Sequence, residues 1–326
     1  MEEMVIKRSK RIPSLYILKT VGAFFVLCAH FGLYKSQYIE PITKSGIFIF
    51  FIISGYFLYN TNTEEIKKKI KHSSIKMLKL ILFFNLFYAV FYFLFRDDWE
   101  WQHINDTNRW IRLLIYGDSV AGILWFLHSY LWTLWFIFIG VHLKLNDGFL
   151  IILAIIVMII GLLNGEYSWL LSDKLHIQDY YIPWIVYSFP MFVSGFLIKK
   201  YENTKVKGLW KFSSLLLVLT IIGSYCEHRF LSVTRHYDGS PMFFTFVQTV
   251  FMLLFAVKNK NIGKDTIFER IGKEHSGNIY YWQNFIGFLM VPIIAMLHLQ
   301  NIELLIILTC LILWSNLMNK FCKKFS

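Results

Sequence analysis

Residues 15–34 read LYILKTVGAFFVLCAHFGLY, and residues 45–60 read SGIFIFFIISGYFLYN. Both segments are almost wholly apolar, although the first contains Lys19 and His30. A helix that crosses the roughly 30 Å hydrocarbon core of a bilayer needs about 20 mostly apolar residues. The two segments therefore predict two membrane-spanning helices. An ionisable side chain inside such a helix is costly, so the two in the first segment indicate a functional site.

The rest of the chain has the same character. Of its 326 residues, 56% are hydrophobic and 17% are charged, and this composition is too apolar for a water-facing surface. We expect an all-α integral membrane protein, a single polytopic domain over residues 1–326 with about ten transmembrane helices. The predicted spans are residues 12–34, 44–60, 77–95, 119–142, 149–164, 181–198, 209–226, 240–257, 276–297 and 302–319.

The formal charge of +12 is distributed in short clusters between the apolar segments. With the N-terminus inside, the segments on the inner side contain 24 Lys and Arg residues, whereas the outer loops contain eight. This asymmetry predicts that both termini are cytoplasmic and that the protein is a multi-pass protein of the cell membrane. It also argues against nucleic acid as a partner. The four cysteines have no metal-ligand spacing, so we expect no metal site.

Lys19 and His30 are eleven residues apart, which is three helical turns plus about 20°. Both side chains therefore point the same way, about 16 Å apart along the helix axis. His30 has the chemistry of a general base, and Lys19 that of a cation for phosphate or developing negative charge. The alternatives are a histidine hydrogen-bonded between helices and a lysine that extends to the inner interface.

The basic stretch 67–79 precedes the third span and is predicted to be part of a cytoplasmic loop. Its simplest interpretation is topogenic charge that contacts anionic lipids. Lys76 and Lys79 form an i, i+3 pair at the mouth of the span, where they could share one face and bind a polyphosphate. Farther along, Tyr280 and Tyr281 are predicted to be interfacial anchors.

Four short motifs resemble those of membrane acyltransferase family 3. Lys19-x10-His30 matches the family's Arg-x10-His with Lys in place of Arg, and FFIISG at 50–55 matches its FF-x-x-SG stretch. LWFL at 124–127 is similar to its H-L-W-F-L segment. IYYWQ at 279–283 is similar to its I-Y-x-x-H segment, with Gln283 in place of His. The family's R-x-x-R motif would fall on Lys76 and Lys79.

The resemblance implies a ten-helix bundle that transfers an acyl group, usually acetyl, to a hydroxyl of a surface polysaccharide or its lipid-linked precursor. The donor would be cytoplasmic acyl-CoA such as acetyl-CoA, with no permanently bound cofactor. His30 would be the base and Lys19 would neutralise phosphate or oxyanion charge. Lys76 and Lys79 would contact the donor, and Trp125 would line the acyl channel.

Two other interpretations stay open. The first is a transporter or export component for a polysaccharide or lipid-linked glycan, which needs no base. The second is a member of the family that kept the scaffold and lost activity. Ser54 is interpreted mainly as a helix-packing residue beside Gly55, with a covalent relay as the alternative. Glu227 is assigned to an outer loop where it could meet a sugar.

Overall fold

The computed structural model describes residues 11–31, 38–95, 112–113, 117, 119–171, 184–204, 208–234 and 240–324. This part of the chain is helical and contains no strand, which confirms the all-α prediction. Its elements are α1 (Pro13–His30), α2 (Glu40–Thr43), α3 (Gly46–Leu58), α4 (Thr63–Phe95), η3 (Gly122–Leu124), α6 (Trp125–His142), α7 (Asp147–Asn164), η4 (Ser168–Leu170), η7 (Trp184–Ser188), α8 (Phe189–Lys200), η8 (Trp210–Phe212), α10 (Ser213–Val233), α11 (Phe243–Lys258), α12 (Ile267–Glu274), α13 (Ser276–Met296), η9 (Gln300–Ile302) and α14 (Glu303–Lys324).

Eight helical stretches of the described chain are long and apolar enough to cross a membrane. They contain α1, α3, α4, α6, α7, α10, α13 and α14. The two remaining predicted spans coincide with the shorter helices α8 and α11, of 12 and 16 residues. Residues 1–10 and 325–326, on which the predicted cytoplasmic ends partly depend, lie outside the described chain.

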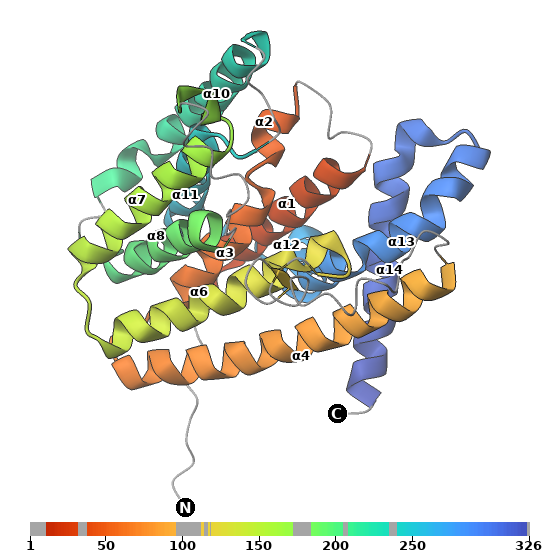
Figure 1. The fold of residues 1–326 in the computed structure, drawn as a ribbon, viewed down its shortest axis with the longest axis horizontal. Helices are drawn as coiled ribbons and strands as arrows, with labels where there is room; N and C mark the ends of the chain where they lie inside the picture. The colour runs from red at the N-terminus through yellow and green to blue at the C-terminus, as the bar shows by residue number, and fades with distance from the viewer. Residues whose placement is uncertain are drawn as a thin grey trace, which may run out of the picture.

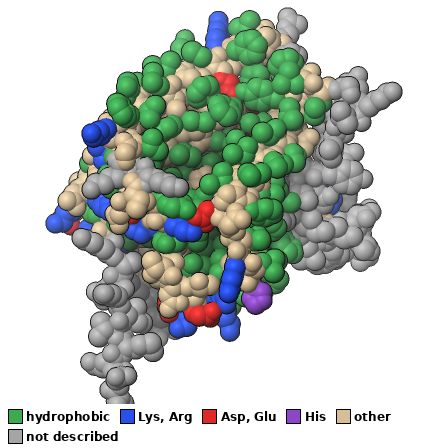
Figure 2. Space-filling model, turned by 90° about the vertical axis from the view of Figure 1, so that its left-hand side faces the viewer, with side chains coloured by type: hydrophobic (Ala, Val, Ile, Leu, Met, Phe, Trp, Pro, Cys, Tyr) green, Lys and Arg blue, Asp and Glu red, His purple; other side chains and the backbone are tan. Residues whose placement is uncertain are grey.

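The outer surface of the bundle is apolar, as a lipid-facing surface must be. On α4 and α7, large hydrophobic side chains such as Leu82, Leu86 and Ile152 are at least 60% exposed. Figure 2 shows hydrophobic side chains over much of one face, with charged side chains gathered mainly in its lower part. The described chain is therefore that of a membrane protein.

Helix α4 corrects the predicted inner loop, because the basic stretch 67–79 is helical and continuous with the third span. At 33 residues the helix is about 50 Å long, which exceeds the hydrocarbon thickness by roughly 20 Å. The side chain of Asn62 accepts a hydrogen bond from the backbone N–H of Glu64 at 2.9 Å and caps this helix. Glu64 and Glu65 then pair with Lys67 and Lys68 one turn later. The capping residue Asn62 and the glutamates after it therefore indicate the start of α4, which hydropathy alone does not predict.

Neighbouring helices form pairs in Figure 1. Helices α4 and α6 run side by side along its lower edge, and α13 packs against α14 on the right. Helix α1 lies near the centre, where it contacts α3, α11, α12 and α13. The helix that contains Lys19 and His30 is thus surrounded by segments from both halves of the chain.

Helices α3 and α8 approach each other through two glycines. A Cβ atom on Gly55 would lie 1.9 Å from the carbonyl oxygen of Phe192, and one on Gly195 would lie 1.9 Å from that of Ile52. The reciprocal contacts show that the two helices are antiparallel and that their backbones touch. Small residues permit such close packing in membranes, so Gly55 of the Ser54-Gly55 pair is a packing residue.

One buried carboxylate joins three segments at the end of this helix pair. Glu202, 3% exposed, accepts hydrogen bonds from Tyr56 of α3 and Lys199 of α8, each at 2.8 Å, and from Lys260 after α11. Burial raises the pKa of Glu202, but the hydrogen bonds from Lys199, Lys260 and Tyr56 outweigh it and lower this pKa overall. The carboxylate is therefore ionised at neutral pH.

We predict that Gly55→Ala destabilises the bundle, because the added methyl group would overlap the Phe192 carbonyl and separate α3 from α8. Overpacking of this kind costs about 1–3 kcal/mol. The thermal midpoint of the purified protein in detergent should fall. Gly208→Ala is the matched control, since among the described residues no heavy atom lies within 4 Å of its added Cβ. Equal thermal midpoints for the two variants would contradict the close backbone contact between α3 and α8.

Acidification is expected to destabilise the protein through Glu202. Its pKa is lower in the folded than in the unfolded chain, so its stabilising contribution is complete above the unfolded value of about 4.3. That contribution is lost as the pH falls through the folded-state pKa. Thermal midpoints measured from neutral pH downward should fall more steeply for the wild type than for Glu202→Gln. Glu65→Gln, which removes a half-exposed carboxylate paired only with the exposed Lys68, should keep a slope close to that of the wild type.

Candidate active site

A cavity of about 430 Å³ opens between α1, α3, α4, α6, α12, α13 and α14. Polar and aromatic side chains are mixed in its wall. The lining residues are Lys19, Phe50, Ser54, Lys76, Met77, Leu80, Phe126, Tyr130, Gly272, Lys273, Glu274, Ser276, Gly277, Asn278, Tyr280, Tyr281 and Asn319. Such a mixture suits a ligand that has both a charged and an apolar part.

Two predicted cations share this cavity. Lys19 is half-buried on α1, with its Nζ 5.9 Å from the ring centroids of both Tyr16 and Phe57. Lys76 reaches the same cavity from α4 and is exposed to solvent. The two rings stabilise the Lys19 ammonium inside the bundle by cation–π attraction. Two lysines on one cavity favour an anionic ligand.

The polar part of the cavity wall on α13 and α14 is held in place by hydrogen bonds between these two helices. Asn278 donates to Ser315 at 2.9 Å and to Asn319 at 3.1 Å. Tyr280 donates from its hydroxyl to the carbonyl oxygen of Ile123, just before α6. These contacts fix the position of α13 relative to α6 and α14, so the cavity wall is rigid on this side.

Helix α12 is fastened to α1 and brings Lys273 and Glu274 to the cavity. A Cβ on Gly272 would lie 1.8 Å from the carbonyl oxygen of Tyr16, so the backbones touch there. Arg11 forms an ion pair with Glu269 at 2.5 Å. The hydrogen bond from Arg11 lowers the pKa of the Glu269 carboxyl, which keeps it ionised.

The structure separates two of the predicted donor-binding residues from the cavity. Lys79 is exposed on α4 and does not line it, because the cavity side of that helix is formed by Lys76, Met77 and Leu80. Trp125 is half-buried and packs against the rings of Phe51 and Tyr187, at 6.5 and 6.4 Å. Neither side chain is therefore among the residues that line the cavity with Lys19 and Lys76.

Aromatic residues that sequence reasoning assigned elsewhere line the cavity instead. Phe126 and Tyr130, one helical turn apart on α6, take the place predicted for Trp125. Tyr280 and Tyr281 were predicted as interfacial anchors, yet both are cavity residues. Their position next to a polar Ser276-Gly277-Asn278 stretch is the signal that could have identified them. No pattern in the sequence indicated that Asn278 and Asn319 would line a cavity.

His30 is the last residue of α1 and lies outside the cavity lining. Its side chain is exposed, whereas the residues before it, Val26 to Cys28, are buried. Its eleven-residue spacing from Lys19 puts both on one helix face, with His30 three turns farther along. Lys19 therefore lines the cavity, whereas His30 lies at the solvent-accessible end of the same helix.

Ser54 also lines the cavity, although Gly55 beside it serves packing. Its hydroxyl donates to the carbonyl oxygen of Phe50 at 2.7 Å, within the same helix. A hydroxyl engaged in this way adds polarity to the wall without a base beside it. The geometry therefore favours packing and lining over a covalent relay.

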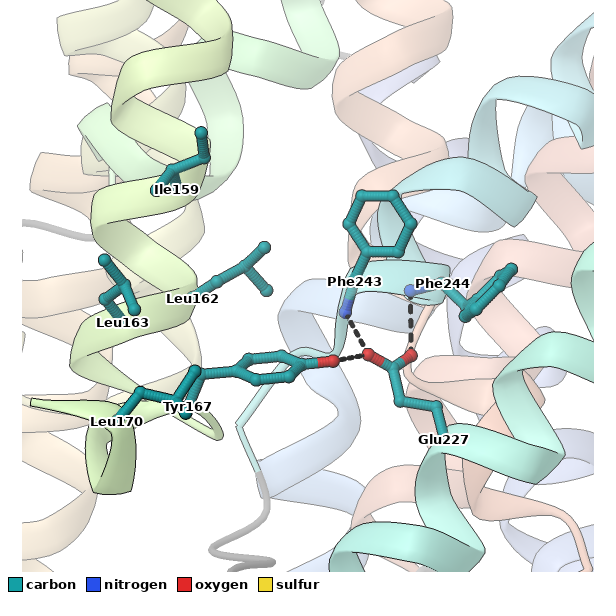
Figure 3. A pocket seen from close by; sticks show the side chains of 8 residues that line it. All are labelled: Ile159, Leu162, Leu163, Tyr167, Leu170, Glu227, Phe243 and Phe244. Carbon is teal, nitrogen blue, oxygen red and sulfur yellow. Dashed lines mark hydrogen bonds between the residues drawn. The ribbon is translucent and has the colours of Figure 1, made fainter.

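A second pocket, of about 330 Å³, lies between α7, α10 and α11 (Figure 3). Its walls are apolar except for Glu227, whose carboxylate accepts hydrogen bonds from the backbone N–H groups of Phe243 and Phe244, each at 2.8 Å. The hydroxyl of Tyr167 donates to the same carboxylate. Glu227 is therefore inside α10 and caps the start of α11, which corrects its assignment to an outer loop.

The sequence from residue 12 to residue 317 matches a family model described as an acyltransferase domain. The match includes Lys19, His30, Lys76 and all the α13 residues of the cavity. No curated protein and no solved structure shows significant similarity to the chain.

We predict that this cavity binds a phosphate-rich anion, with inorganic triphosphate as the probe. Lys19→Met should weaken binding about tenfold because a partly buried charge is removed. Lys76→Met should weaken it about threefold because its charge is solvated. Isothermal titration calorimetry in detergent measures the triphosphate affinity of both variants. Added salt should reduce the loss of affinity caused by Lys76→Met. Lys79→Met is the matched control, and a loss equal to that of Lys76→Met would contradict this placement.

Proposed function

Because this chain belongs to acyltransferase family 3, we propose that it is a membrane O-acyltransferase. It transfers an acyl group, first of all acetyl, from cytoplasmic acyl-CoA to a hydroxyl of a surface polysaccharide or its lipid-linked precursor. The observation that carries this proposal is the shared cavity of Lys19 and Lys76, which combines cationic, polar and aromatic walls. An acyl-CoA has the matching chemistry, with phosphates at one end and an uncharged thioester at the other.

The charge pattern supports delivery of the donor from the cytoplasm. Lys76 and Lys273 lie in segments that the positive-inside rule assigns to the inner side, and Lys19 is near the inner end of its span. In this orientation both termini are cytoplasmic and the bundle has ten spans in the cell membrane, with α8 and α11 as the two short ones. The cavity then faces the compartment in which acyl-CoA is made.

His30 is the base of the proposed reaction. It takes the proton of the acceptor hydroxyl while the oxygen attacks the thioester carbonyl carbon. The tetrahedral intermediate then collapses, the carbon–sulfur bond breaks, and the coenzyme A thiolate leaves and receives the proton from His30. The products are an O-acyl ester and free coenzyme A. The exposure of His30 at the end of α1 supports this role because an acceptor has access to it.

Lys19 and Lys76 bind the phosphates of the donor in this mechanism. A lysine ammonium is a compact charge that cannot make the planar two-point contact of an arginine. The half-buried position of Lys19 between two rings offsets this, since its charge is less hydrated. Lys79 and Trp125 have no direct contact with the donor in this proposal.

The test is transfer of radiolabelled acetyl groups from acetyl-CoA in membranes that contain the protein at matched expression. The label should enter a glycan or lipid-linked glycan fraction. His30→Ala should reduce the rate by a factor of about 10²–10⁴, the usual contribution of a general base. His142→Ala, which removes an exposed histidine at the end of α6, should retain the wild-type rate.

Three outcomes would contradict the proposal or the role of His30 in it. No transfer from any acyl-CoA, together with altered glycan export in cells that lack the protein, would favour the transporter. Absence of both transfer and any export effect would favour a member of the family that has lost activity. Equal rates for His30→Ala and His142→Ala would exclude His30 as the base.

A further inference from the structure

Gln283 is a fully buried polar side chain in the membrane-spanning helix α13. Within the part of the chain that the structure describes, neither its Nε2 nor its Oε1 atom has a hydrogen-bond partner. Buried side-chain amides are nearly always hydrogen-bonded, because leaving one unpaired in an apolar medium is costly. A buried amide with both ends unpaired is therefore a candidate for hydrogen bonding to a ligand.

Gln283 is not one of the residues that line the cavity, but it lies on the same face of α13 as two residues that do. Ser276, Tyr280, Gln283 and Gly287 follow one another at intervals of four, three and four residues and so share one helix face. Ser276 and Tyr280 line the cavity. Gly287 packs against the residue after His30, since a Cβ there would lie 2.6 Å from the ring of Phe31.

Helices α1 and α13 run in the same direction past each other. The contact of Gly272 with Tyr16 precedes that of Gly287 with Phe31 in both segments. Gln283 lies one turn, about 6 Å, before Gly287, and about 10 Å beyond Ser276. The amide is therefore between the level of Lys19 in the cavity and the level of His30.

We propose that Gln283 binds the amide-containing arm of the acyl donor. This inference rests on the proposed function, which puts the phosphates at Lys19 and Lys76 and the thioester at His30. The arm of coenzyme A between these two groups contains two secondary amides. A glutamine side chain donates from Nε2 and accepts at Oε1, so the carbonyl oxygen of one amide of the arm can accept from Nε2 while the N–H of the other donates to Oε1. A fully ionised phosphate only accepts hydrogen bonds, so it would leave Oε1 unpaired.

The test compares two probes that share the nucleotide but not the arm. Coenzyme A contains the amides, whereas adenosine 3′,5′-bisphosphate has phosphates and no amide. Gln283→Leu should weaken coenzyme A binding about tenfold, the effect of losing paired hydrogen bonds at a buried site, and leave the bisphosphate affinity unchanged. Lys19→Met should weaken the binding of both. Isothermal titration calorimetry in detergent measures the affinity of the wild type, Gln283→Leu and Lys19→Met for each probe.

Folding of the variant is checked separately. Leucine has a similar volume and removes an unpaired polar group, so the thermal midpoint of Gln283→Leu should equal or exceed that of the wild type. Unchanged coenzyme A affinity, or equal losses for both probes, would overturn the role of Gln283 while leaving the acyltransferase proposal intact. A wild-type protein that binds neither probe would overturn the donor site itself, and with it this inference.

Discussion

The backbone contact between α3 and α8 is the constraint on which the rest of the bundle depends. Lipid chains provide no hydrophobic driving force between helices, so close packing and interhelical hydrogen bonds must hold the spans together. Gly55 and Gly195 permit this contact, and the Glu202 network locks its end. Because Gly55 faces α8, the adjacent Ser54 faces the cavity, so one two-residue sequence provides both the packing and part of the site.

The two predicted catalytic residues lie on a single helix. Helix α1 contains the half-buried Lys19 in the cavity and the accessible His30 at its end. An ammonium inside a membrane bundle needs compensation, and the rings of Tyr16 and Phe57 and the polar cavity wall provide it. In the proposed reaction, the separation of Lys19 and His30 by three helical turns suits an elongated donor, whose charged end and reactive end are far apart.

Hydrogen bonds and close contacts between the two ends of the chain give the site its shape. Helix α12 is fixed to α1 by the Gly272 contact and the Arg11–Glu269 ion pair, and α13 is fixed to α14 through Asn278. The cavity is therefore formed only after the last third of the sequence has packed against the first helix. A family match from residue 12 to residue 317 is consistent with a site that needs nearly the whole chain.

The sequence alone determined the all-α membrane class and the family, and it singled out Lys19 and Lys76, which share a cavity in the structure. Apolar length and the cost of intramembrane charge are local properties, so they can be read from the sequence. Hydropathy did not predict the polar first turns of α4, although Asn62 and the two glutamates after it are typical of a helix N-terminus. Only the tertiary structure decided that Phe126, and not Trp125, lines the cavity, and that Lys79 is excluded from it. These helices are apolar on every side, so their rotation depends on which neighbours they pack against, and no periodicity in the sequence specifies that.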